Sequence, residues 1–281
     1  MTGAGFLDFR SDTVTRPDAA MRSAMATAEV GDDILDGDPT VRALEEKAAA
    51  ALGVQAALWV PSGTMGNTIA LYTQLRRGDR FLAPALAHVL EGETGAVAAL
   101  VGGMPHPLPW EGHPGGISPG TVRAEAASTG PYYAVRTTLL CVENTHNAAG
   151  GTVLDAGEWA KLTAVAAESG LRVHLDGARI WNAAVALGVG VLELTRGADT
   201  VQACLSKGLG APVGSVVGGS AAFVTEARRV RKMLGGAVRQ GGVLAAAGLL
   251  ALDRVERLQE DHDNARLLAS ELAALGWDVD E

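Results

Sequence analysis

The stretch Leu171–Arg179, LRVHLDGAR, decides the fold class. It begins as a short apolar run typical of a buried strand and then places Asp176 directly before a glycine. Open α/β sheets bind ligands beyond the carboxyl ends of their strands, and a carboxylate there needs a partner. The stretch therefore predicts a buried strand with a functional Asp176 at its end. On this motif alone, an aspartate that only caps the next helix is an equally good interpretation.

Similar short apolar runs alternate with alanine-rich helical runs, as expected when parallel strands are joined by crossover helices. Their Val, Leu and Ile content with little alternation indicates strands that are covered on both faces. Helix ends are marked as well, since Asp38 precedes Pro39 and Gly53 follows the same helical run. The strands are expected at Ala57–Val60, Arg80–Ala83, Thr138–Val142, Leu171–Leu175, Thr200–Leu205 and Ser215–Gly218.

Two regions depart from this alternation. Gly102–Pro131 is rich in glycine and proline, which predicts a long surface loop with at most one helical turn. From Val243 the chain reads as helical with a leucine stripe, and Gly276–Val279 then resembles the beginning of a strand whose continuation is missing. We therefore expect a large domain over residues 1–250 and the opening helix of a truncated small C-terminal α/β domain over residues 251–281.

The composition excludes several classes of protein. A formal net charge of -9 over 281 residues argues against nucleic acid or an anionic membrane as partner, because both select for clustered Lys and Arg. The 2 cysteines lie in apolar runs, so neither a disulfide framework nor a zinc site is expected, and no other metal site is indicated. We find no export signal and no apolar run of membrane-spanning length, and expect a cytoplasmic protein.

Two further motifs carry chemistry. Cys204–Gly210 reads CLSKGLG and places Lys207 after a predicted strand. A lone lysine is usually a surface charge, but a desolvated one is a nucleophile that can form an imine. Pro61–Asn67 follows another predicted strand with small and hydroxyl residues, and such a turn offers backbone N–H groups to a phosphate, although a plain βα loop has the same appearance. The run Gly208–Val213 fails the dinucleotide-binding pattern because it ends in valine.

Together these motifs resemble the threonine aldolase family, a branch of the aminotransferase-like enzymes that use pyridoxal 5′-phosphate (PLP). The resemblance runs from Asp8 to the end of the chain. It implies the α/β fold of a three-layer, fold type I PLP-dependent transferase with a mostly parallel sheet. It also implies aldol cleavage of L-threonine or L-allo-threonine, or of another β-hydroxy-α-amino acid, to glycine and acetaldehyde or the matching aldehyde. The matching motifs are RSDTVTRP at 10–17, VGDD at 30–33, DPTV at 38–41, SGTM at 62–65, ENTHN at 143–147, HLDGAR at 174–179, SKG at 206–208 and GGAVRQ at 235–240.

Family roles, carried over by motif position, concern first the cofactor. Lys207 would carry PLP as a Schiff base, and Asp176 would pair with the pyridine nitrogen and make the ring a better electron sink. Gly63 and Thr64 would bind the phosphate, with Ser206 as a neighbouring cofactor contact.

The same resemblance assigns substrate contacts. Arg179, which would also contact the cofactor, and Ser11 would hold the substrate carboxylate. The planar guanidinium of arginine can form two parallel hydrogen bonds to a carboxylate. The alternative for Arg179 is a surface ion pair. His88 would stack on the cofactor ring near the substrate hydroxyl and relay a proton. Many relatives have a second active-site histidine where this chain has Tyr133, or Tyr132 if the loop shifts, and a tyrosine hydroxyl is the expected replacement.

Other residues in these motifs keep two interpretations. Glu93 orients its neighbours or is a solvated acid, and His146 contacts the cofactor region or fixes a turn. The resemblance implies a homodimer or a dimer of dimers whose sites are built from two subunits. Arg239, or Arg16, would then reach a neighbour's phosphate, unless it is a surface charge.

Two rival functions stay open at this point. The same scaffold supports β-elimination or transamination, because fold does not fix the reaction. Relatives continue into a small domain that supplies another carboxylate-binding arginine. Without it, the chain would be a catalytically inactive PLP-binding protein.

Overall fold

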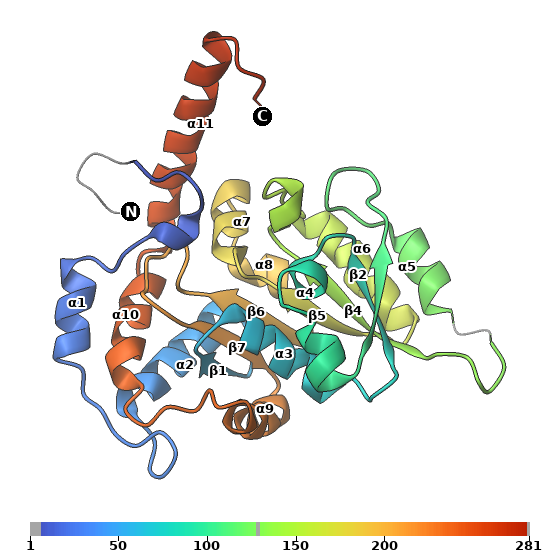
Figure 1. Cartoon of the computed structure of the whole chain (residues 1–281), viewed down its shortest axis with the longest axis horizontal. Coiled ribbons are helices and arrows are strands. Elements are labelled where there is room, and N and C mark those ends of the chain that lie inside the picture. Colours follow the sequence, from blue (N-terminus) through green and yellow to red (C-terminus); the bar gives the residue numbers. More distant parts are fainter. Residues whose placement is uncertain (1–6, 128–129, 280–281) are drawn as a thin grey trace.

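The computed structural model describes residues 7–127 and 130–279, which build a seven-stranded sheet with helices on both faces (Figure 1). The strand order is β1-β7-β6-β5-β4-β2-β3. From β6 to β3 all neighbours are parallel, whereas β7 is antiparallel to both β1 and β6. The strands are β1 (Ala56–Val60), β2 (Arg80–Pro84), β3 (Met104–Leu108), β4 (Thr137–Glu143), β5 (Arg172–Asp176), β6 (Thr200–Cys204) and β7 (Ser215–Gly219).

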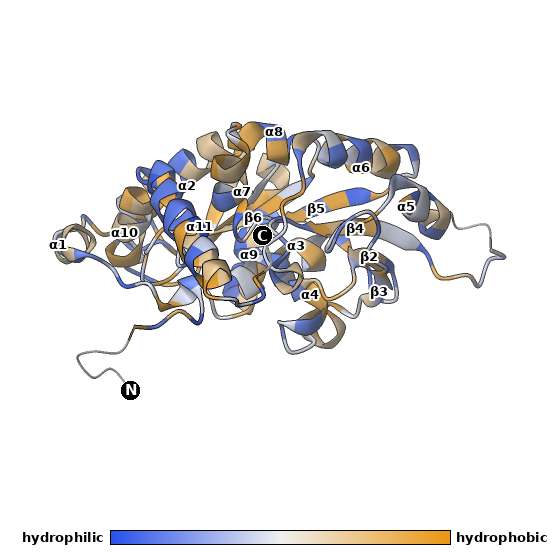
Figure 2. Ribbon diagram, turned by 90° about the horizontal axis from the view of Figure 1, so that it is seen from above, coloured by the Kyte–Doolittle hydropathy of each residue, from blue (hydrophilic) through white to orange (hydrophobic). Residues whose placement is uncertain are grey.

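Helices cover both faces of this sheet and form two apolar cores. One core takes buried side chains from α2, α6, α7, α8 and α10, and the other takes them from α3 and α9. Seen from above, the apolar strands lie between two helical layers (Figure 2). The three-layer α/β architecture with a mostly parallel sheet is therefore confirmed. The helices are α1 (Ala19–Ala26), α2 (Pro39–Leu52), α3 (Gly63–Gln74), α4 (His88–Glu91), α5 (Pro119–Ala126), α6 (Ala156–Glu168), α7 (Ile180–Leu187), α8 (Val191–Thr195), α9 (Ala221–Met233), α10 (Gly242–Leu252) and α11 (Leu258–Ala274), and short turns lie at Asp12–Val14, Val97–Val101, Asn147–Ala149 and Val255–Arg257.

The strands expected from sequence are confirmed to within one residue at each end. The expectation of a long surface loop with at most one helical turn over Gly102–Pro131 is wrong, because this interval contains the strand β3 and the eight-residue helix α5; residues 128 and 129 lie outside the described residues. β3 reads MPHPL, and its two prolines argue against a strand when the sequence is considered alone. Proline is tolerated there because β3 is an edge strand that pairs only with β2, so its outer side needs no N–H donors.

The last helix, α11, projects away from the sheet (Figure 1). Its leucine stripe is largely exposed, with Leu267 at 60% and Leu275 at 77%. Gly276–Val279 forms no strand, so that expectation is wrong, and residues 280 and 281 lie outside the described part. The division into residues 1–250 and 251–281 stays a prediction. None of the helices in the described part combines the length and apolar character that a membrane crossing requires.

A buried carboxylate joins two helices that are far apart in sequence. Asp38 is 0% exposed and caps α2, where its side chain accepts the N–H groups of Thr40 and Val41 at 3.0 Å each. It also accepts the N–H of Gly31 at 3.1 Å and that of Gly242, at the start of α10, at 2.9 Å. The carboxylate therefore satisfies free donors at the N-termini of both helices and faces the positive ends of their dipoles.

We predict that Asp38→Ala lowers the free energy of unfolding by about 3–4 kcal/mol, because several buried N–H groups lose their acceptor together. Chemical denaturation of the full chain measures this change. The matched control is Asp155→Ala, an exposed cap of α6 in a capping box, for which about 1 kcal/mol is expected. Equal losses in the two variants would contradict the bridging role of Asp38.

Candidate active site

The two central strands are apolar on one face only. Val173 and Leu175 of β5 and the corresponding residues of β6 point into the larger core. The alternate positions of β5 carry His174 and Asp176, and those of β6 carry Thr200 and Gln202, all of them buried. Side chains alternate across a strand, so this places a row of polar groups on the face that α3 covers.

A cavity of about 330 Å³ opens at the carboxyl end of these strands. This is the edge where parallel sheets place their ligand sites. The cavity brings together six residues that the sequence assigned to the cofactor, namely Lys207, Asp176, His88, Gly63, Thr64 and Ser206. Asn67, Gln202, Cys204 and Thr13 also line it.

The N-terminus of α3 forms one wall of the cavity. Its cap, Ser62, accepts the N–H of Met65 with its side chain and that of Gly66 with its carbonyl. Within the described residues, the N–H groups of Gly63 and Thr64 have no acceptor. A helix start with free N–H groups facing a cavity binds a phosphate well. Glycine at position 63 also keeps this wall open, since a Cβ there would lie 3.0 Å from the sulfur of Cys204, a tight contact.

Asp176 is held by donors on both of its oxygens. Oδ1 accepts the N–H of Ala178 at 3.1 Å, and the Gln202 amide nitrogen lies 2.8 Å away in the orientation that also satisfies the Gln202 oxygen. Oδ2 accepts the side-chain N–H of Asn67 at 2.7 Å. The carboxylate is 3% exposed, so these bonds offset the loss of water that burial imposes.

Asn67 also donates to Glu93 Oε1 at 2.7 Å, and the same oxygen lies 3.0 Å from His88 Nδ1. Burial raises the pKa of Glu93, and the hydrogen bond to Glu93 raises the pKa of His88.

His88, Glu93 and Asp176 offer ligand atoms within 4.8 Å of one another, a spacing that could hold a metal ion. The two N–H groups of Asn67 point at both carboxylates, which favours a hydrogen-bonded network over a cation there.

Glu143 ends β4 beside this network. Its Oε2 accepts the backbone N–H of His88 at 2.6 Å, and its Oε1 accepts that of Asn147 at 2.9 Å. Burial, and then the charge of Asp176, raise the pKa of Glu143 to about 7. Glu143 therefore fixes the backbone that carries the His88 ring.

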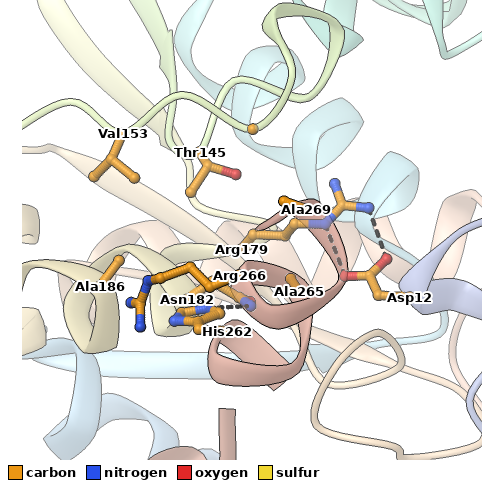
Figure 3. A pocket seen from close by; sticks show the side chains of 11 residues that line it. Asp12, Thr145, Val153, Arg179, Asn182, Ala186, His262, Ala265, Arg266 and Ala269 are labelled. Atoms are coloured by element: carbon orange, nitrogen blue, oxygen red, sulfur yellow. Dashed lines mark hydrogen bonds and ion pairs between the residues drawn. The ribbon is translucent and has the colours of Figure 1, made fainter. Parts of the chain in front are cut away.

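Arg179 lies in an adjoining cavity of about 490 Å³ between α7 and α11 (Figure 3). Its Nε and Nη2 donate to the two oxygens of Asp12 at 2.8 and 2.7 Å, and its Nη1 donates to Asn147 Oδ1 at 2.9 Å. Burial by itself would raise the pKa of Asp12, but the hydrogen bonds from Arg179 and the positive charges of Arg179 and Lys207 together lower it. Ser11 precedes Asp12 and caps the short turn that follows, where it accepts the N–H of Thr13 at 3.2 Å.

Several predicted site residues are not brought into the cavity within one chain. Tyr133 is 75% exposed just before the amino end of β4, opposite the carboxyl edge, so it does not reach the cavity of its own chain, and its catalytic role stays a prediction. Arg239 pairs with Asp32 at 2.8 Å, its side chain is 60% exposed and it does not line the cavity, so its cofactor contact also stays a prediction. His146 is buried edge-on against Trp110, with ring centroids 5.5 Å apart, and does not line the cavity.

Sequence reasoning gave no role to Asn67, His174, Glu143 or Asp12. Each of them lies inside a motif that was quoted, which is the one available signal. Asn67 follows Gly63 by one helical turn and therefore faces the same side of α3. Its partners, Asp176 and His174 on β5 and Glu93 after α4, come near only in the folded chain, which no local pattern reveals.

The fold and the site together define a three-layer α/β enzyme with its active site at the carboxyl edge of the sheet. The chain belongs to the beta-eliminating lyase family, whose model matches residues 8–280. It is 46% identical to low-specificity L-threonine aldolase 1 of Arabidopsis thaliana over 95% of this chain and 75% of that protein. It is 44% identical to the low specificity L-threonine aldolase of Escherichia coli K12 over 97% of this chain and 81% of that protein.

A solved structure has the same fold. The threonine aldolase of Leishmania major superposes with a TM-score of 0.81 at 21% identity, over 96% of this chain and 81% of that one. The resemblance to threonine aldolases that the motifs carry is therefore confirmed, and so is the expected fold type.

A pH-dependent stability follows from Glu143. Its folded pKa of about 7 lies above its ordinary value of 4.5, so its contribution to stability is complete below about 4.5 and is lost as the pH rises to about 7. We predict that the stability difference, wild type minus Glu143→Gln, falls over this range. Denaturant unfolding of the full chain across it gives the difference, and equal m-values in both proteins serve as the control. A difference that stays constant or grows with pH would contradict the assignment.

Proposed function

We propose that this chain is a PLP-dependent aldehyde-lyase that cleaves L-threonine or L-allo-threonine, and related β-hydroxy-α-amino acids, to glycine and acetaldehyde or the matching aldehyde. One observation carries the proposal: Lys207, Asp176, His88 and the free N–H groups of α3 line one cavity. The printed activities of relatives at 44% and 46% identity support the same reaction.

The residues present fit the cofactor. Lys207 would hold PLP covalently, Asp176 would pair with its pyridine nitrogen, and the N–H groups of Gly63 and Thr64 would bind its phosphate. When bound, PLP supplies an electron sink for the charge left at Cα when the Cα–Cβ bond breaks.

The remaining steps belong to side chains of this chain. Arg179 and Ser11 would bind the substrate carboxylate and set which bond at Cα stands perpendicular to the cofactor ring. His88 has Nδ1 held by Glu93 at 3.0 Å, which leaves Nε2 to accept the proton of the β-hydroxyl. The pKa of His88 is raised by this partner, so it is suited to hold that proton once transferred.

We also propose that the enzyme is a cytoplasmic homo-oligomer, a dimer or a tetramer. Tyr133 and Arg239 are exposed and would reach a site only from a neighbouring subunit. Light scattering across a dilution series, compared with activity, tests whether assembly and turnover are linked.

The family description favours a second candidate, β-elimination. Both reactions use the same lysine and the same electron sink, so the site geometry alone leaves both available. The products separate them, because elimination from threonine gives ammonia and a keto acid instead of glycine and acetaldehyde.

We predict that Lys207→Ala abolishes glycine and acetaldehyde formation from L-threonine and L-allo-threonine in the presence of PLP, because the cofactor loses its covalent anchor. The matched control is Lys161→Ala on the exposed side of α6, which should retain full activity. A keto acid as the main product would favour the elimination reaction. If the wild-type chain showed a cofactor absorbance band but cleaved neither substrate, it would be a PLP-binding protein without this activity.

A second change tests the substrate contact. Arg179→Lys should raise KM about tenfold or more with a smaller change in kcat, because lysine cannot form two parallel bonds to a carboxylate. Steady-state kinetics with L-threonine measure both constants. Arg123→Lys, in an exposed pair with Glu168, is the control, and an equal rise in KM there would remove the assignment of Arg179.

A further inference from the structure

We infer that Asn67 is a positioning residue for the reaction: it ties Glu93, the hydrogen-bond partner of His88, to the carboxylate of Asp176. The inference builds on the proposed function, because His88 and Asp176 are its proposed proton acceptor and cofactor partner. The function itself gives Asn67 no part.

The Asn67 amide bridges two buried acids. The residue is 1% exposed, and its nitrogen lies 2.7 Å from both Glu93 Oε1 and Asp176 Oδ2. A side-chain amide nitrogen carries two hydrogens, so each carboxylate receives one. Two ionised carboxylates in one buried site repel each other, and a shared donor between them offsets part of that repulsion.

The orientation of this amide is fixed from its other end. Gln74 Nε2 donates to Thr200 Oγ1 at 2.8 Å, so the Thr200 hydroxyl is free to donate to His174 Nδ1, also at 2.8 Å. His174 Nε2–H then donates to Asn67 Oδ1 at 3.0 Å. Burial lowers the pKa of His174 to about 4, so the ring stays neutral with a single N–H. Each group in this series therefore donates to the next, from Gln74 to Asn67. The last donor occupies the Asn67 oxygen, so the Asn67 nitrogen faces the carboxylates.

Glu93 depends on Asn67 because it has few other donors. Its Oε1 accepts an N–H of Asn67 and lies next to His88 Nδ1, while its Oε2 has no hydrogen-bond partner among the described residues. Burial and the charge of Asp176 already raise the pKa of Glu93. Without the Asn67 donor, Glu93 would protonate more readily and His88 would lose its anionic acceptor.

The expected consequence reaches His88. The acidic groups whose charges raise the pKa of His88 are Glu93, Asp176 and Glu143, and Lys207 lines the same cavity. Of these acids, Glu93 makes the hydrogen bond that most raises the pKa of His88. Removal of Asn67 should therefore lower the pKa of His88 and release Nδ1 from its fixed role as donor.

The experiment is an NMR titration of His88 in the full chain, with and without PLP, beside the pH profile of kcat/KM. In Asn67→Leu we expect His88 to titrate at lower pH than in wild type and the acid limb of kcat/KM to move the same way. Asn67→Ser keeps one hydroxyl donor and a smaller side chain, so it should give an intermediate shift even if the leucine variant folds poorly.

Two comparisons separate this role from a loss of packing. Glu93→Gln removes the charge through which Asn67 acts, so the double variant should titrate at His88 like Glu93→Gln alone. Thr195→Val removes a buried hydroxyl, 5% exposed, that donates to the Leu52 carbonyl outside this network, and it should leave the His88 titration unchanged. The inference would be overturned if the shifts of the Asn67 and Glu93 variants added up in the double variant. It would also be overturned if His88 titrated as in wild type in both Asn67 variants. A shifted His88 in a chain that cleaves no threonine would instead keep the coupling and refute the proposed function.

Discussion

A carboxylate buried at the end of a central strand governs the design of this site. Asp176 is 3% exposed, and a charge so far from water is tolerable only with several donors around it. Those donors come from three separate elements: the backbone after β5, Gln202 on β6 and Asn67 on α3. The need to satisfy one side chain therefore fixes how closely α3 and these two strands must approach.

Close approach of α3 to the sheet depends on glycine. A Cβ at Gly66 would lie 2.7 Å from the Gln202 side chain, and one at Gly63 would crowd both Cys204 and Gln202. Because neither glycine has a Cβ, α3 packs directly over the polar row of β5 and β6, with its free N–H groups at the cavity. The same packing thus provides the hydrogen bonds of Asp176 and the candidate phosphate site.

The sequence identified those parts of the molecule whose signal is local. Short apolar runs gave the strands, and Lys207 and Asp176 stood out because each follows such a run directly. β3 was missed because Pro105 and Pro107 contradict a strand everywhere except at an edge, and edge position is a property of the whole sheet. Asn67 and Glu143 were missed for a similar reason, because each has a partner distant in sequence: Asp176 on β5 for Asn67, and the backbone of His88 in α4 for Glu143. Tyr133 was placed by motif position, which takes no account of which end of β4 it occupies.

The N-terminal segment links the two halves of the site. Thr15 donates to the carbonyl of Lys207 at 2.8 Å, and Asp12, three positions earlier, grips Arg179. Asp12 occupies the Nε and Nη2 side of the guanidinium with a charged bond, whereas Nη1 is held only by the neutral oxygen of Asn147. A charge-assisted pair is stronger than a bond to a neutral acceptor, so a substrate carboxylate that binds Arg179, as proposed, would displace Asn147 more easily than Asp12. Asp12 would then be the fixed anchor that orients the outer edge of Arg179, and one short segment contacts both the lysine and the arginine.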